Sequence, residues 1–91
     1  MMVDKGTQLR NVGASDRQII YNYVLVEHRA QEINASKLLV EIRPRIQNYA
    51  CSNPQMKKFW ENGVSALHQY YGNDNVYLGG VTVAPLDCGY R

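Results

Sequence analysis

Residues 19–27 constrain the fold more strongly than any other part of the chain. They read Ile-Ile-Tyr-Asn-Tyr-Val-Leu-Val-Glu and are dense in the β-branched and aromatic residues that fit a pleated strand. Alternate side chains of a strand point to opposite faces, and here both faces receive mainly apolar or aromatic residues. The segment is therefore predicted to be a central strand.

Three further segments have the features of strands. Residues 3–14 alternate loosely and are interpreted as an edge strand, with turn-forming residues after it. Residues 64–71 alternate more regularly, and residues 76–83 follow after a loop rich in turn-forming residues. The Gly79-Gly80 pair predicts a bulge or a bend inside this last strand.

A first helix is predicted after the central strand. Asn34 or Ser36 can cap it, and its apolar residues recur at helical spacing as far as Tyr49. Pro44 falls inside that pattern and removes one backbone hydrogen bond. We therefore expect this helix to bend or break near Val40.

A second, shorter helix has clearer limits. Asn53 is a good N-cap residue, Pro54 suits the first helical position, and Asn62-Gly63 is typical of a left-handed stop. Phe59 and Trp60 belong to an apolar stripe, which predicts that both side chains anchor this helix against the sheet.

The order of these elements is ββααββ. It predicts an α+β domain with two helices packed on one face of an antiparallel sheet. A chain of 91 residues leaves room for one small domain, so residues 1–91 are expected to form a single unit.

The charge and hydropathy of the chain argue against two classes of partner. Ten basic and eight acidic residues give a formal net charge of +2, far from the dense positive field of an avid nucleic-acid binder. No stretch approaches the roughly 18 apolar residues that are needed to span a bilayer. We expect no nucleic-acid partner and no membrane span.

No motif in the chain specifies a reaction. His28 and His68 belong to no recognisable catalytic pattern, and neither Cys-x-x-Cys nor a Cys/His cluster suggests zinc. His68 could be a general base, but a structural histidine is the commoner outcome when no positioned nucleophile lies beside it. We expect no enzyme activity, and hence no catalytic residue, cofactor or metal site.

Tyrosines are frequent in the predicted strands. Tyr70, Tyr71 and Tyr77, around the last hairpin, form a candidate surface for protein contact, because tyrosine is enriched at interfaces. Cross-strand aromatic packing and the stacking of nucleic-acid bases are the alternatives. These tyrosines and a short first strand, which would leave an open sheet edge, also predict a weak homodimer.

The residues leave two alternatives open for the cysteines, Cys51 and Cys88. A disulfide would indicate an oxidising compartment, whereas two buried free thiols are common in cytosolic proteins. A crosslink would matter here, since the core of so small a domain supplies little net stability.

Four short motifs stand out along the chain: Tyr21-Asn22-Tyr23, Cys51 ahead of the short helix, Asn62-Gly63-Val64 and the closing Asp87-Cys88. Together they resemble a group of small uncharacterised exported proteins of Gram-negative bacteria, and the resemblance covers nearly the whole chain. Members of the group are typically preceded by a signal or membrane-anchor segment. The resemblance implies export and a Cys51–Cys88 disulfide, and it implies no catalytic residue, cofactor or substrate.

We expect the leader to be missing from this chain, so that membrane contact is expected only through a missing leader segment. A relative carried on a mobile gene cassette is an alternative origin. We expect a small, disulfide-stapled periplasmic or envelope-associated domain that acts by binding, most plausibly through a protein contact. The alternative is a cytosolic accessory or nucleic-acid-associated protein with free thiols.

Overall fold

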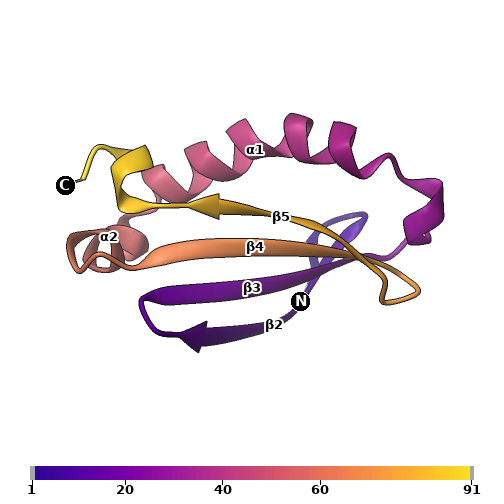
Figure 1. Ribbon diagram of the computed structural model, residues 1–91, viewed down its shortest axis with the longest axis horizontal. Helices are drawn as coiled ribbons and strands as arrows, with labels where there is room; N and C mark the ends of the chain where they lie inside the picture. The colour runs from indigo at the N-terminus through magenta and orange to yellow at the C-terminus, as the bar shows by residue number, and fades with distance from the viewer. Residues whose placement is uncertain (1, 91) are drawn as a thin grey trace.

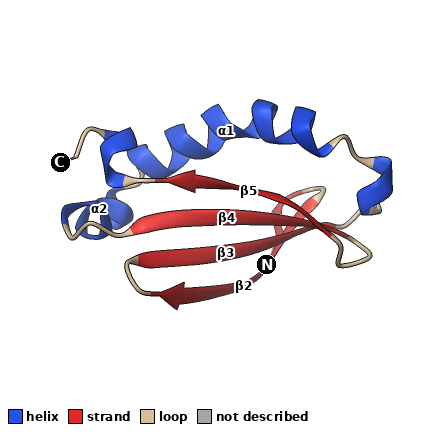
Figure 2. Cartoon of the chain, viewed as in Figure 1, coloured by secondary structure: helices blue, strands red, loops and turns tan. Residues whose placement is uncertain are grey.

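The computed structural model describes residues 2–90 as an α+β fold (Figure 1; Figure 2). Its strands are β1 (Met2–Asp4), β2 (Thr7–Ser15), β3 (Gln18–Leu25), β4 (Ser65–Gly72) and β5 (Tyr77–Val83). Its α-helices are α1 (Ala35–Ser52) and α2 (Lys57–Glu61), and its short 3-10 helices are η1 (Ala30–Glu32), η2 (Pro54–Met56) and η3 (Pro85–Cys88).

The sheet is mixed, and its strands lie in the order β1-β2-β3-β4-β5. Strands β3 and β4 are parallel, whereas all other neighbouring strands are antiparallel. The expectation of a purely antiparallel sheet is therefore wrong. After β3 the chain passes back along α1 and enters β4 beside the start of β3, with Gln18 opposite Ser65. A crossover of this kind joins parallel strands.

The order of the elements is βββααββ rather than ββααββ. The strand expected over residues 3–14 is divided by a turn at residues 5–6 into β1 and β2, which pair with each other. The Asp4 carboxylate accepts a hydrogen bond of 2.9 Å from the backbone N–H of Gly6, and this bond closes the turn.

Helix α1 continues through Pro44, so the break expected near Val40 does not occur. Asn34 caps the helix, because its side-chain oxygen accepts a hydrogen bond of 3.1 Å from the backbone N–H of Lys37. Pro44 leaves the carbonyl of Val40 without its helical donor. Both residues are exposed, so water can hydrogen-bond that carbonyl and the helix tolerates the loss.

The buried core lies where α2 and the second half of α1 meet one end of the sheet. Trp60 lies at the centre of this core and is 1% exposed, as the sequence predicts. It clusters with other buried residues: Ala50, Met56, Ala66 and Val83. The Phe59 side chain is 40% exposed, so the expectation that Phe59 shares this anchoring role is wrong.

The short helical segment has the limits that its sequence predicts. The Asn53 side chain accepts a hydrogen bond of 3.0 Å from the backbone N–H of Gln55, and Pro54 occupies the first turn of η2. Gly63 follows α2 with a φ of +74°, a left-handed conformation that favours glycine.

The bulge expected at Gly79-Gly80 is present. The register of β4 with β5 shifts between Tyr70 and Tyr71, next to Gly79. Gly79 has a φ of +142°, and a Cβ atom there would lie 2.6 Å from Cδ1 of Leu39. Glycine at this position therefore lets α1 approach β5 closely.

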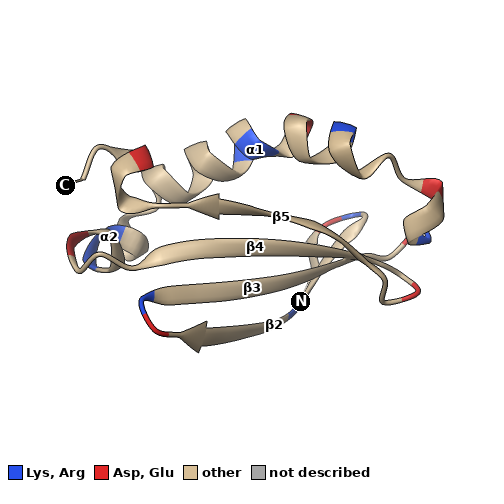
Figure 3. Ribbon diagram, viewed as in Figure 1, with Lys and Arg blue, Asp and Glu red and all other residues tan. Residues whose placement is uncertain are grey.

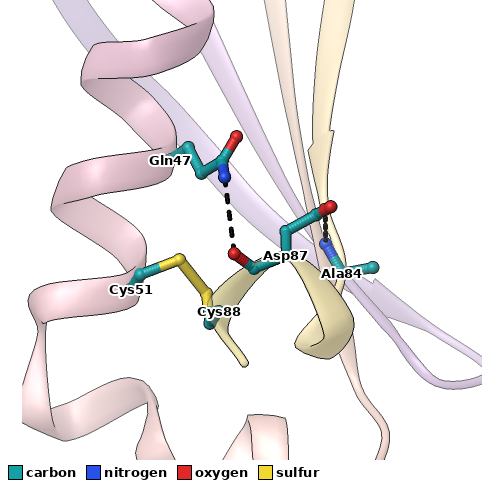
Figure 4. Close-up of a disulfide and its surroundings, with 5 residues drawn as sticks. All are labelled: Gln47, Cys51, Ala84, Asp87 and Cys88. Atoms are coloured by element: carbon teal, nitrogen blue, oxygen red, sulfur yellow. Dashed lines mark hydrogen bonds between the residues drawn. A yellow bond between two sulfur atoms is a disulfide. The ribbon is translucent and has the colours of Figure 1, made fainter. Parts of the chain in front are cut away.

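Cys51 and Cys88 form a disulfide that joins the end of α1 to η3 (Figure 4). Their Cα atoms are 5.1 Å apart, within the usual range for a disulfide. Beside the bridge, the Gln47 side chain donates a hydrogen bond of 3.4 Å to the backbone carbonyl of Asp87. The crosslink implied by the resemblance is thus confirmed, and it ties the helical layer to the segment after β5.

Candidate functional site: a groove between helix α1 and the sheet

Helix α1 packs mainly against β5 and leaves part of the same sheet face open. A cavity of about 750 Å³ lies there between α1 and strands β1, β2 and β3. We call it the α1–sheet groove; its main lining residues are Leu38, Ile42, Ile46 and Tyr49 of α1, Met2 and Val3 of β1, Leu9 of β2, and Tyr21, Tyr23, His68 and Tyr70 of β3 and β4. Its size and apolar character are typical of sites for small molecules.

The floor of the groove is a set of nearly parallel rings. The parallel register of β3 and β4 places Tyr21 opposite His68 and Tyr23 opposite Tyr70. The ring centroids of Tyr21 and His68 are 4.9 Å apart at an interplanar angle of 11°, and those of Tyr23 and Tyr70 are 5.0 Å apart at 17°. Stacked rings at these distances stabilise one another and hold the floor in a defined geometry.

His68 is the one histidine of this floor, and its side chain is 6% exposed. Its Nδ1 atom lies 3.0 Å from the hydroxyl oxygen of Tyr23, a hydrogen-bond distance. Its Nε2 atom is buried and has no hydrogen-bond partner within residues 2–90. Burial lowers the pKa of His68 to about 4, so the ring is neutral near pH 7.

The tyrosine hydroxyls of the floor are also neutral. Burial, followed by the nearby Asp4 carboxylate, raises the pKa of Tyr70 to about 12. Burial raises the pKa of Tyr23 still further, with smaller contributions from neighbouring tyrosines. These hydroxyls therefore remain hydrogen-bond donors across the physiological pH range.

The three strands β3, β4 and β5 contain no Asp, Glu, Lys or Arg, so the charged residues lie on the other elements and in turns (Figure 3). Arg45 of α1 and Asp4 of β1 line the groove from its two walls. A smaller, more open hollow of about 450 Å³ adjoins one end and shares Tyr49, Asn53 and Gln55 with the groove.

The three tyrosines expected to form a contact surface do not share one face of the sheet. Tyr70 is 8% exposed and lines the groove. Tyr71 follows it on β4 and therefore points to the opposite face. There its ring contacts that of Tyr77 at a centroid distance of 5.5 Å, and the Arg10 guanidinium lies 4.9 Å from its centroid. The prediction that Tyr70, Tyr71 and Tyr77 form a single contact surface is therefore wrong.

The sequence did not identify Tyr21, Tyr23 and His68 as parts of one site. The alternation of residues 19–27 does place Tyr21 and Tyr23 on a common face. No local pattern indicates that the His68 ring stacks against both of these rings, because that contact requires the parallel pairing of β3 and β4.

Burial of His68 predicts a pH-dependent stability. An unfolded histidine titrates near pH 6.5, whereas His68 in the fold titrates near 4, so between these values only the unfolded state binds the proton. The contribution of the neutral, buried His68 to the stability of the fold is therefore complete above about pH 6.5, and it is lost as the pH falls towards 4. As the pH falls from 7 to 5, protonation of His68 in the unfolded state should lower the free energy of unfolding by about 2 kcal/mol.

Urea unfolding at the two pH values measures this loss. The His68→Gln variant should lack it, whereas His28→Gln, which changes an exposed histidine, should retain it. Equal pH dependence in the parent protein and His68→Gln would contradict the assignment.

Two other classes of site, metal centres and membrane-spanning helices, are not found within residues 2–90. No three histidine, cysteine, aspartate or glutamate side chains gather in this range so that they could hold a metal ion. None of the helices in the same range combines the length and apolar character that crossing a membrane requires.

Comparisons with known proteins support the fold. No protein-family model matches the chain, and no curated protein sequence matches it. The structure is similar to the crystal structure of a protein from Pseudomonas aeruginosa described as a putative secreted protein. The TM-score is 0.78 at 13% sequence identity, over 97% of this chain and 77% of that one.

At this identity the likeness shows a shared fold. The Cys51–Cys88 disulfide suggests an oxidising, extracytoplasmic location, because disulfides form and persist in such compartments. The disulfide argues against the alternative of a cytosolic protein with free thiols, and nothing in the comparisons supports an origin on a mobile gene cassette.

Proposed function

We propose that this protein is a periplasmic or envelope-associated binding domain without catalytic activity, and that it takes a small, mainly apolar ligand in the α1–sheet groove. The observation that carries the proposal is the groove itself, a cavity of about 750 Å³ lined by aliphatic and aromatic side chains. Burial of apolar ligand surface in such a site is favourable by roughly 25 cal/mol per Å² before the costs of association.

The groove also offers a limited number of polar contacts. His68 and the hydroxyls of Tyr23 and Tyr70 are uncharged, so they suit a neutral hydrogen-bonding group better than an ion. The Asp4 carboxylate near Tyr70 disfavours an anionic group at that end of the groove. A ligand with an apolar body and one neutral oxygen or nitrogen function fits this arrangement.

Binding of the apolar fluorescent probe N-phenyl-1-naphthylamine tests the proposal. The parent protein should increase the probe's fluorescence saturably, with one probe per chain. Ile42→Glu places a carboxylate in the groove and should weaken binding at least about tenfold, because an unpaired charge is costly in an apolar site.

Val40→Glu is the matched control. Val40 lies on the same helix but is 73% exposed and does not line the groove, so this variant should bind the probe like the parent. Circular dichroism shows whether both variants keep the fold. Amide shifts in NMR spectra of the parent should concentrate on groove residues when the probe is added; the largest shifts on the Tyr71 side of the sheet, or no saturation, would overturn the proposal.

Contact with another protein chain is a second candidate function. The sequence favoured it because of the strand tyrosines, but the structure divides those tyrosines between two faces. The observation that now favours it is an open edge of the sheet along β2.

A further inference from the structure

Strand β2 is only partly covered by its outer neighbour. Strand β1 pairs with β2 at Thr7 and Gln8, whereas β2 continues to Ser15. Residues 10–15 therefore have a strand on one side only, β3, and all of them are exposed (Figure 1). Alternate residues along such an edge direct their backbone N–H and C=O groups outward, where another strand can pair with them.

The other edge strand of the sheet, β5, packs against helix α1, and Leu39 lies in contact range of Gly79 there. Natural proteins usually block open edges with lysine, proline or a covering element. Residues 10–15 contain neither lysine nor proline, and the Val12 side chain is 53% exposed.

Arg10 does not block this edge. Its guanidinium hydrogen-bonds the Asn75 side chain and lies over the ring of Tyr71, so it is held across the sheet towards β4. The bulge between Leu9 and Asn11 lies at Arg10, the first residue of the exposed segment. From Asn11 to Ser15, β2 pairs regularly with β3.

We infer that two copies of this chain associate by antiparallel pairing of residues 11–15 of their β2 strands, around a twofold axis at Gly13. The segment is self-complementary in this register. Val12 lies opposite Ala14 of the second copy on one face, and Asn11 lies opposite Ser15 on the other. Gly13 at the axis has no side chain, and an added Cβ there would have no neighbouring atom within 4 Å.

The matching pairs come from the segment itself. Val12 and Ala14 stand at equal distances from Gly13, and so do Asn11 and Ser15. A foreign peptide would need residues complementary to these positions, whereas a second copy of this chain already has them.

The paired strands would extend the groove. Val12 pairs with Tyr21, which lies on the groove floor, so the second copy continues the same sheet face. The result is a sheet of twice five strands with two grooves on one face. A short strand pairing buries little surface, so the dimer is expected to be weak. The inference stands independently of which ligand the grooves take.

Sedimentation velocity over protein concentrations from about 10 μM to about 1 mM tests the association. The parent should shift from a species of 10.4 kDa towards one of twice that mass. The double variants Val12→Glu/Ala14→Glu and Val12→Lys/Ala14→Lys each place like charges across the interface and should remain monomeric. An equimolar mixture of the two should restore the dimer, because opposite charges then face each other.

Val76→Glu is the control, since Val76 is equally exposed, at 52%, but lies in the turn before β5. It should dimerise like the parent. A parent that stays monomeric at every concentration overturns the inference. A double variant that dimerises like the parent, or mixed variants that remain monomers, overturns it as well. If the parent is monomeric but a foreign peptide protects the amides of residues 10–15 from exchange, the edge has another occupant and the second copy is wrong.

Discussion

Replacing Trp60 by alanine should lower the free energy of unfolding by about 3 to 5 kcal/mol. Trp60 is 1% exposed and packs where α2, α1 and the sheet meet, so its removal leaves a large cavity among groups that cannot collapse fully. Urea unfolding followed by circular dichroism measures the loss. A change below about 1 kcal/mol would show that the side chain contributes little to the core.

Two further variants separate the causes of this effect. The indole N–H of Trp60 is buried without a hydrogen-bond partner in the described part of the chain. Trp60→Phe keeps most of the apolar volume and removes this unpaired donor, so it should cost much less than Trp60→Ala. Phe59→Ala changes the adjacent, 40% exposed residue and should also cost less, because less apolar surface leaves the interior.

Removal of the disulfide should lower the free energy of unfolding by nearly as much as Trp60→Ala does. The Cys51→Ala/Cys88→Ala double variant opens a crosslink that spans a sequence separation of 37 residues. In the chain-entropy account, a closed loop of this length stabilises the fold by about 4 kcal/mol, because the crosslink restricts the unfolded chain. That is a large fraction of the roughly 5 to 15 kcal/mol typical of a folded domain.

Reduction provides the matched comparison for the disulfide. Dithiothreitol should lower the stability of the parent by a similar amount and leave the double variant unchanged. Gln47→Ala, which removes only the exposed hydrogen bond to Asp87 beside the bridge, should change the free energy of unfolding by no more than about 0.5 kcal/mol. Quantitative alkylation of both cysteines without reductant, in native protein from its natural compartment, would contradict the disulfide.

Local sequence patterns correctly predicted those helices and strands that are defined by residues close together in the chain. The apolar and aromatic run at residues 19–27 became β3, which has a strand on each side. Asn53, Pro54 and Gly63 mark the short helical segment because capping, a fixed proline φ and a left-handed stop are properties of single residues. The same reasoning failed at Pro44, because exposure of α1 at that point makes the lost hydrogen bond tolerable.

The tertiary structure decided what the candidate site is. Alternation tells which side chains share a face of one strand, but neither the partner nor the direction of pairing, since those depend on contacts between residues far apart in the chain. The parallel pairing of β3 with β4 places His68 beside Tyr21 and Tyr23, and the close approach of α1 to β5 leaves the groove open over the rest of that face. The sequence by itself thus determined the central strand, the limits of the short helical segment and the buried Trp60. Only the folded chain determined the groove and the free edge of β2, because both arise from how distant segments pack.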